Sequence, residues 1–322
     1  MDNLQFYRDR YLEYCTFNRK LAPSTIYGYR HDLNSFMLFL EKLEPPALCW
    51  TQDKRKHLDH YLELVSEHYS VCTIKGFFSS LRCFFYFLQD DGLEFDNPFR
   101  KFRLHMQKPA SIPVSLTLGE VTGILTEAYK SETSSVFRKT RDILVLELLF
   151  SGGMRVAELC GITVSRYDPV EKAIDVIGKG SKNRFIFITN KEVLSLLDDY
   201  LTLRSNLSFR NGTQVLCDNL LLTDRLLPLK PIHVRGIIKK YVIASGITKR
   251  VTPHTFRHTF ASLLLEEGVD IKYIQEFLGH SSIKTTQIYL HTSSGRKREI
   301  LAEMHPRRKL GCLLYTSPSP RD

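Results

Sequence analysis

One stretch of the chain, residues 104–116, has neither helical nor strand periodicity and interrupts a sequence that is otherwise patterned mainly as helices. It contains Pro109 and Pro113, and prolines at this spacing favour an extended backbone. The chain has 322 residues, which is enough for two ordinary domains. We therefore predict an N-terminal domain over residues 1–103, a linker over 104–116 and a second domain over 117–310.

The N-terminal domain is patterned as a compact set of helices. Apolar residues recur at helical spacing within 4–15, 29–40, 58–65 and 74–88. The last of these patterns ends at Asp90, Asp91 and Gly92, a sequence typical of a helix stop. Four helices in about a hundred residues predict an all-helical domain.

The second domain is predicted to be mainly helical as well. Thr117 and Glu120 have the spacing of a capping box, so a helix is expected from about residue 117. An apolar run at 142–150 ends at two glycines, which places Arg155 in the first turn after the break. Further helices are predicted at 191–203, 233–244, 255–267, 271–277 and 286–290.

A β-hairpin is predicted in the middle of this domain. Residues 173–177 and 184–188 are rich in β-branched and aromatic side chains, and a turn rich in glycine and lysine, with Lys179 in it, joins them. This turn lacks the glycine and lysine spacing of a nucleotide-binding loop, and no helix follows it. The fold class expected is therefore mainly α with a small β-hairpin or sheet, in two domains.

The net charge of the chain indicates the kind of partner that it binds. The chain has 45 Lys and Arg against 35 Asp and Glu, a formal net charge of +10. Such a surplus favours a polyanionic partner, either nucleic acid or an acidic membrane surface. The charge alone does not decide between these two.

Two features indicate the compartment. The seven cysteines are scattered and never form a C-x-x-C pair, so neither a disulfide framework nor a zinc site is expected. No run approaches the roughly 18 apolar residues of a membrane span, and the N-terminus has no secretion signal. We expect a cytoplasmic protein that does not enter a membrane.

Residues suited to chemistry concentrate between positions 252 and 291. His254 and Arg257 are three positions apart, so on a helix both side chains lie on one face. His280 follows 23 residues after Arg257, and Tyr289 follows nine residues after His280. Taken singly, each of these residues is more typical of ordinary packing or a solvated surface, and only their joint spacing points to a site.

With Arg155 and the hairpin Lys179 added, this set resembles the tyrosine recombinases of the phage integrase family, the Xer-like site-specific recombinases among them. The resemblance extends from Leu4 to about Met304. It implies an N-terminal helical, SAM-like core-binding domain that binds DNA and a C-terminal α+β catalytic domain. The candidate catalytic residues are Arg155, Lys179, His254, Arg257, His280 and Tyr289.

The activity implied by the resemblance is site-specific recombination of double-stranded DNA through a covalent 3′-phosphotyrosine intermediate, without metal, ATP or other cofactor. It also implies a homotetramer on DNA, with accessory DNA-bending proteins as further partners. Arg155 and Arg257 suit this chemistry because guanidinium groups stay charged and match phosphate oxygens bidentately. His254 can hydrogen-bond the phosphate or take the tyrosine proton.

The other three candidates complete the proposed reaction. Lys179 is placed to protonate the departing 5′-oxygen, and His280 to donate a hydrogen bond to a non-bridging oxygen. Tyr289 is the nucleophile, because a tyrosyl phosphodiester retains the energy of the cleaved bond and the free 5′-hydroxyl can reverse it. Rejoining then needs no ATP.

Several alternatives stay open at this stage. His254 and His258, four positions apart, could form half of a metal site, but no third ligand stands at a suitable spacing. The scaffold could also serve a DNA-binding regulator without catalysis, or a relaxase like the type IB topoisomerases. A pure binder would have no need of the complete catalytic set.

The end of the chain changes character. Residues 311–322 follow a basic run and show no helical or strand period, so we interpret them as a disordered or non-native tail. The resemblance also makes residues 296–310 a candidate for a segment that is passed to a neighbouring protomer.

Overall fold

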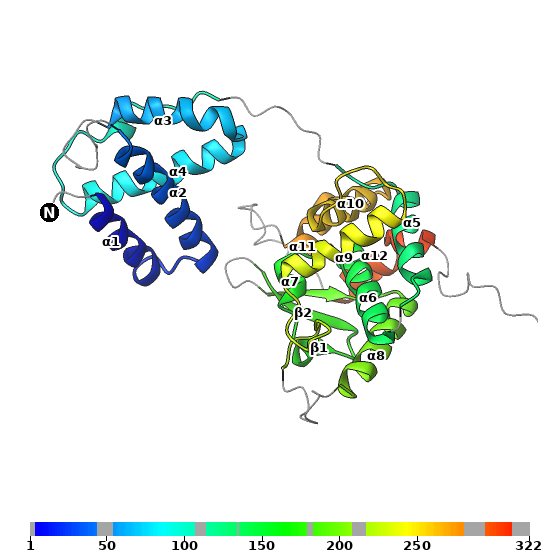
Figure 1. Cartoon of the computed structure of the whole chain (residues 1–322). Coiled ribbons are helices and arrows are strands. Elements are labelled where there is room, and N and C mark those ends of the chain that lie inside the picture. Colours follow the sequence, from blue (N-terminus) through cyan, green and yellow to red (C-terminus); the bar gives the residue numbers. More distant parts are fainter. Residues whose placement is uncertain are drawn as a thin grey trace, which may run out of the picture. The chain divides into compact units, whose positions relative to one another are not determined.

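The computed structural model describes residues 4–43, 54–106, 114–133, 135–178, 183–207, 217–279 and 294–310. The chain divides into two compact units, residues 1–111 and 112–322 (Figure 1). The predicted short helix at 286–290 and the tail at 311–322 lie outside the described residues.

The first unit is a helical bundle with an aromatic core. Its described helices are α1 (Leu4–Phe17), α2 (Pro23–Glu41), α3 (Arg55–His68), α4 (Val71–Asp90) and the 3-10 turn η1 (Pro98–Arg100). Phe36, Phe84 and Phe85 are almost fully buried where α2 and α4 pack together. The burial of these large apolar side chains stabilises the unit, as the helical spacing in the sequence predicts.

Helix α4 is long and apolar enough to cross a membrane by length and composition. Eight of its residues, including Phe77, Phe78, Leu81 and Leu88, are buried in the core of the first unit. A helix that supplies a domain core is apolar for that reason, and this composition therefore does not indicate a membrane span.

The second unit is built around a buried helix. Its described helices are α5 (Leu118–Lys130), α6 (Val136–Gly152), α7 (Val156–Cys160), α8 (Lys191–Ser205), α9 (Pro231–Ala244), α10 (Pro253–Glu266), α11 (Ile271–Leu278) and α12 (Ser294–Met304), with 3-10 turns η2 (Val164–Arg166) and η4 (Pro306–Leu310). Helix α6 is buried from Arg141 to Gly152, and α5, α8 and α10 pack against it. The capping box before α5 is confirmed, since Thr117 Oγ1 accepts from the Glu120 N–H at 3.2 Å and Glu120 Oε2 from the Thr117 N–H at 2.8 Å.

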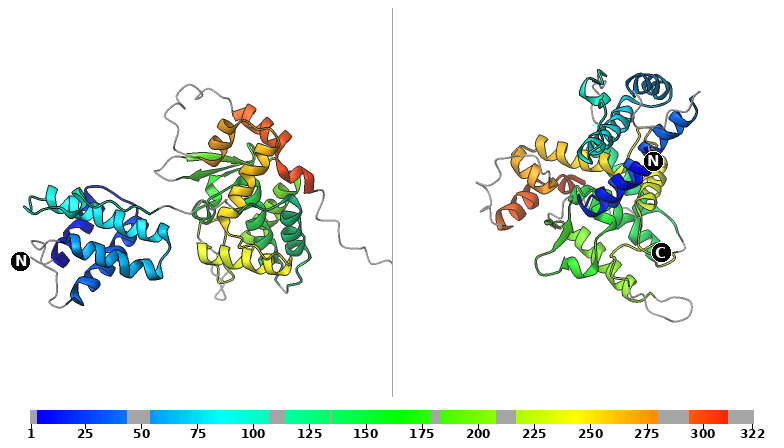
Figure 2. Two further views of the ribbon diagram at one scale, coloured as in Figure 1. Left: turned by 90° about the horizontal axis from the view of Figure 1, so that it is seen from above. Right: turned by 90° about the vertical axis from the view of Figure 1, so that its left-hand side faces the viewer.

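The described residues of this unit also form one small antiparallel sheet, in the order β1 (Tyr167–Asp168), β2 (Ala173–Ile177), β3 (Asn183–Phe187). The predicted hairpin is confirmed, with Asp175 paired to Phe185 at its centre. Strand β1 was not predicted, because two residues are too few to show a strand period. Figure 2 shows the sheet from two further directions, lying among the helices of the second unit.

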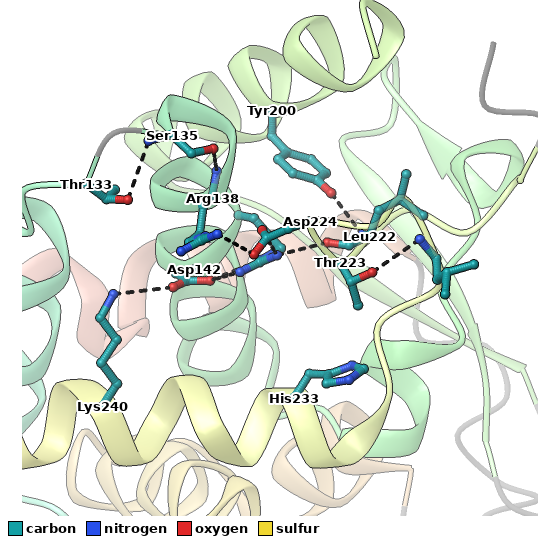
Figure 3. A network of polar contacts seen from close by, with 12 residues as sticks. Thr133, Ser135, Arg138, Asp142, Tyr200, Leu222, Thr223, Asp224, His233 and Lys240 are labelled. Atoms are coloured by element: carbon teal, nitrogen blue, oxygen red, sulfur yellow. Dashed lines mark hydrogen bonds and ion pairs between the residues drawn. The ribbon is translucent and has the colours of Figure 1, made fainter. Parts of the chain in front are cut away.

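A polar network secures the start of α6 (Figure 3). Arg141, whose side chain is 8% exposed, binds Asp142 at 2.7 Å and Asp224 at 2.9 Å and donates to the Leu222 carbonyl. From α9, Lys240 lies 3.8 Å from Asp142. These contacts hold the N-terminal part of α6 against α9 and against the turn near residue 224. The position of α6 is thus fixed at the end opposite to the one that leads to Arg155.

The C-terminal segment packs on its own unit. Ile300 and Leu301 of α12 join the apolar cluster formed with Phe260 and Phe277. Beyond α12, the Arg307 side chain is 1% exposed and pairs with Glu147 of α6 at 3.0 Å. The segment is thus held on its own unit in the middle and near the C-terminal end of its described length.

Candidate active site

A glycine turn between α6 and α7 places the first candidate, Arg155. Gly153 ends α6 in the left-handed conformation, with φ of 53°, and a Cβ there would lie 2.5 Å from Phe260 Cδ1. Only glycine fits this conformation and this space without strain. Arg155 follows two residues later as the residue preceding α7.

The second candidate, Arg257, is buried on α10 and is 6% exposed. Its Nη1 donates to the Gly153 carbonyl at 2.8 Å and its Nη2 to the Leu278 carbonyl at 2.6 Å. One guanidinium group therefore joins the end of α6 to the end of α11.

Arg155 reaches the same end of α11. Its Nη2 donates to the Gly279 carbonyl at 3.3 Å, one residue beyond the carbonyl that Arg257 uses. The structure thus brings Arg155 and Arg257 together at consecutive carbonyls, immediately before His280.

A buried carboxylate that the sequence analysis did not single out accompanies them. Glu158, with its side chain 3% exposed, accepts from Arg155 Nη1 at 2.6 Å and from the Arg155 backbone N–H at 2.9 Å. Glu158 is the third residue of α7, and its carboxylate reaches back to the backbone N–H of the residue that precedes the helix.

A third arginine, Arg184 of β3, was also not predicted. Its Nη2 lies 2.8 Å from Glu158 Oε2 and its side chain is 9% exposed. Its Nε and Nη1 have no hydrogen-bond partner among the described residues. A Cβ on Gly279 would lie 2.8 Å from Arg184 Cδ, so Arg184 packs directly against the backbone that Arg155 contacts.

The electrostatics of this cluster favour an anion. Burial, then the charges of Arg155 and Arg184, lowers the pKa of Arg257 to about 10, which leaves it charged at neutral pH. Burial acts to raise the pKa of Glu158, but Arg184 and Arg155 outweigh it and the pKa lies below its ordinary value. Three arginines against one carboxylate leave a surplus of positive charge, which suits phosphate oxygens.

His254 lies on α10 about one turn before Arg257, and His258 is the residue directly after Arg257. His254 is exposed and His258 is half-buried. Both line a pocket of about 470 Å³ together with Arg257 and Arg250. His254 therefore lies within reach of a group bound beside Arg257, as a proton acceptor or hydrogen-bond donor.

The remaining candidates, Lys179, His280 and Tyr289, lie outside the described residues. Gly178, directly after β2, precedes Lys179, and Gly279, directly after α11, precedes His280. Their roles stay predictions from the sequence.

As for metals, the described residues contain no group of three or more His, Cys, Asp or Glu that could hold an ion. The arrangement around Arg155 and Arg257 is rich in donors and contains a single carboxylate, Glu158, which the arginines already occupy. Such a donor set suits an anionic ligand better than a cation.

Two family models match the chain. The phage integrase family matches residues 116–296, and the N-terminal SAM-like domain of phage integrases matches residues 9–92. Together these matches cover parts of both compact units.

Full-length relatives resemble the chain from end to end. A tyrosine recombinase of Agathobacter rectalis is 36% identical over 313 residues, which cover 96% of this chain and 99% of the relative. The tyrosine recombinase XerC of Thermodesulfovibrio yellowstonii is 33% identical over 310 residues, covering 95% of this chain and 98% of the relative.

Solved structures show the same fold. The XerH site-specific recombinase bound to palindromic difH substrate in a post-cleavage complex has a TM-score of 0.69 at 22% identity, covering 89% of this chain and 82% of that one. The Tn1549 transposon integrase in complex with transposon right end DNA has a TM-score of 0.68 at 21% identity, covering 92% and 98%.

Proposed function

This chain belongs to the phage integrase family and is a tyrosine-type site-specific recombinase, and from that premise we propose that it cleaves and rejoins DNA through a covalent bond to Tyr289. The observation that carries the proposal is the convergence of Arg155 and Arg257 on the carbonyls of Gly279 and Leu278. These carbonyls end α11 immediately before His280, in the part of the chain that leads to the proposed nucleophile.

In the proposed reaction, the Tyr289 oxygen attacks the phosphorus of one phosphodiester, and the bond from phosphorus to the 5′-oxygen breaks. His254 takes the proton of the phenol, and Lys179 gives a proton to the departing oxygen. The product is a 3′-phosphotyrosine and a free 5′-hydroxyl. Attack by a 5′-hydroxyl reverses the step, so that no ATP is consumed.

The arginines would act on the charge that develops on the phosphate. Arg155 and Arg257 are already fixed by backbone carbonyls and by Glu158, so they need little reorganisation when the phosphate arrives. Arg184 would serve as a positioning residue, because it holds Glu158 from the other side. No step of this scheme passes through a metal ion or another cofactor.

The proposed partner is double-stranded DNA at specific recombination sites. The net charge of +10 supports it, as do XerH and the Tn1549 integrase, which were solved with DNA. We further propose that residues 1–103 bind the DNA core beside the catalytic domain, that residues 104–116 link the two domains, and that a homotetramer assembles on DNA with accessory DNA-bending proteins. The site of action would be the cytoplasm.

The experiment that tests the function is a covalent-trapping assay. Wild-type protein and Tyr289→Phe are each incubated with plasmid carrying the native flanking DNA, and SDS then reveals protein attached to DNA. We expect an adduct with wild type only, and equal DNA binding by both proteins.

The alternatives predict different results. A DNA-binding regulator would form no adduct on the plasmid or on a nicked suicide substrate, although it would bind specifically. A relaxase would form the adduct and relax supercoils, but would not exchange strands between two sites in one plasmid.

A further inference from the structure

The pocket beside Arg257 is also lined by residues that do not belong to the cluster of Arg155, Arg184 and Arg257. It has a volume of about 470 Å³, and its wall includes Arg250 and Thr252 from the segment that leads into α10. His254 and His258 add two imidazole rings to the same wall. None of the described residues that line it is acidic.

Arg250 is an arginine of this wall that the proposed reaction does not use. It is exposed, and among the residues that the structure describes it makes neither an ion pair nor a hydrogen bond. The preceding residue behaves differently, because Lys249 Nζ lies 2.8 Å from Glu120 Oε2 on α5. Of two adjacent cations, one is thus paired within the protein and the other remains available at the pocket.

DNA brings evenly spaced charges to such a surface. Successive phosphates of one strand are separated by ~3.4 Å along the helix axis, so a strand whose scissile phosphate lies at Arg257 presents a second phosphate close by. A free guanidinium in an acid-free pocket is suited to bind it, because its fork matches two phosphate oxygens.

We propose that Arg250 binds a backbone phosphate next to the scissile phosphate and so sets the register of the cleaved strand in the active site. The inference rests on the proposed function, since it takes Arg257 as the ligand of the scissile phosphate. Contacts to phosphates fix the position of a protein on a duplex without reading its sequence. Arg250 is therefore a positioning and binding group rather than a participant in bond cleavage.

The test removes one charge from the DNA and one from the protein, separately and together. Duplexes carry one methylphosphonate, a neutral replacement for a phosphate, at each position on either side of the cleavage point. Their affinities are measured with Tyr289→Phe, which binds without cleaving, and with the same protein carrying Arg250→Ala. We expect one flanking position at which the neutral group weakens binding about tenfold when Arg250 is present. At the same position it should have no effect on the protein with Arg250→Ala, because that protein has already lost the contact to this phosphate.

Lys249→Ala is the matched control. It removes the same charge from the preceding position in the chain and should retain the full sensitivity to the methylphosphonate. The inference is overturned if Arg250→Ala keeps the same position-specific sensitivity as Lys249→Ala, or if no flanking position is sensitive in either protein. Failure of the proposed function would be distinct, since it would show as the lack of a Tyr289 adduct on unmodified DNA.

Discussion

The guanidinium of Arg257 donates a hydrogen bond of 2.6 Å from Nη2 to the carbonyl oxygen of Leu278. Its other terminal nitrogen binds the Gly153 carbonyl at 2.8 Å. One side chain therefore fixes the distance between the turn that holds Arg155 and the backbone that leads to His280. The geometry of the site depends on the planar fork of this arginine as well as on its charge.

Arg257→Lys should slow strand cleavage strongly while leaving the fold and DNA binding nearly intact. Lysine keeps the positive charge but cannot span both carbonyls with a fixed fork. Loss of one preorganised donor to a developing charge costs about 10²- to 10³-fold in rate. The measurement is the rate of adduct formation on a suicide substrate, beside the dissociation constant for the same DNA.

Arg204→Lys is the control for this change. Arg204 of α8 also binds a backbone carbonyl with two nitrogens, at 3.2 and 2.9 Å from the Asn219 oxygen, but it is not part of the arginine cluster. Its replacement should leave the cleavage rate within about twofold of wild type. An equal loss of activity in both variants would mean that the effect of Arg257→Lys is one of general stability.

Gly279→Ala should impair cleavage by displacing Arg184. Gly279 has φ of 62°, and a Cβ there would lie 2.8 Å from Arg184 Cδ and 3.3 Å from its Nε. Gly246 has a similar φ of 71° but open space around it, so Gly246→Ala carries the same backbone cost without the clash. We expect both variants to lose about 1 kcal/mol of stability and only Gly279→Ala to lose activity. Equal cleavage rates in the two variants would contradict this.

The buried pair of Glu147 and Arg307 should be sensitive to single substitution. Their side chains are 0% and 1% exposed, and Arg307 Nε and Nη2 both contact the carboxylate. Arg307→Met leaves a buried charge without compensation, which costs about 3–5 kcal/mol. The double variant Glu147→Leu with Arg307→Met should recover most of this loss. Urea unfolding followed by circular dichroism measures both.

The exposed pair of Lys249 and Glu120 in the same unit provides the comparison. Their side chains are 42% and 23% exposed, and Lys249→Met should cost less than about 1 kcal/mol. If Arg307→Met also cost less than about 1 kcal/mol, the pair of Glu147 and Arg307 would not be what holds the C-terminal segment.

His305 should make stability depend on pH in mildly acid solution. In its neutral form both ring nitrogens are satisfied, Nε2 by the Ser151 carbonyl at 2.8 Å and Nδ1 by the Arg307 N–H at 2.9 Å. Burial lowers the pKa of His305 from 6.5 to about 4, so the unfolded chain takes up a proton at a pH where the folded chain does not. Stability is then complete above pH 6.5 and falls as the pH drops toward 4.

The measurement is the free energy of unfolding between those pH values. The contribution of this group should approach a slope of about 1.4 kcal/mol per pH unit in wild type, and it should be absent in His305→Gln. His68→Gln, at a side chain that is 67% exposed, should leave the slope unchanged. A slope that survives in His305→Gln would assign the effect to other groups.

The sequence by itself determined the positions of the helices and the set of candidate catalytic residues. The capping box at Thr117 and the apolar periods of the helices are signals between near neighbours, so they can be read without knowledge of the fold. The order and spacing of Arg155, His254 and Arg257 along the chain likewise required no coordinates.

Only the tertiary structure decided which charges meet. Arg184 joins Glu158 across 26 residues and Arg307 joins Glu147 across 160, and no local pattern records either pair. Whether a charged residue is solvated or buried depends on the side chains that pack around it from distant parts of the chain. That packing buried Arg307, which in the sequence is only one residue of a basic run, and it placed Arg184 against Gly279.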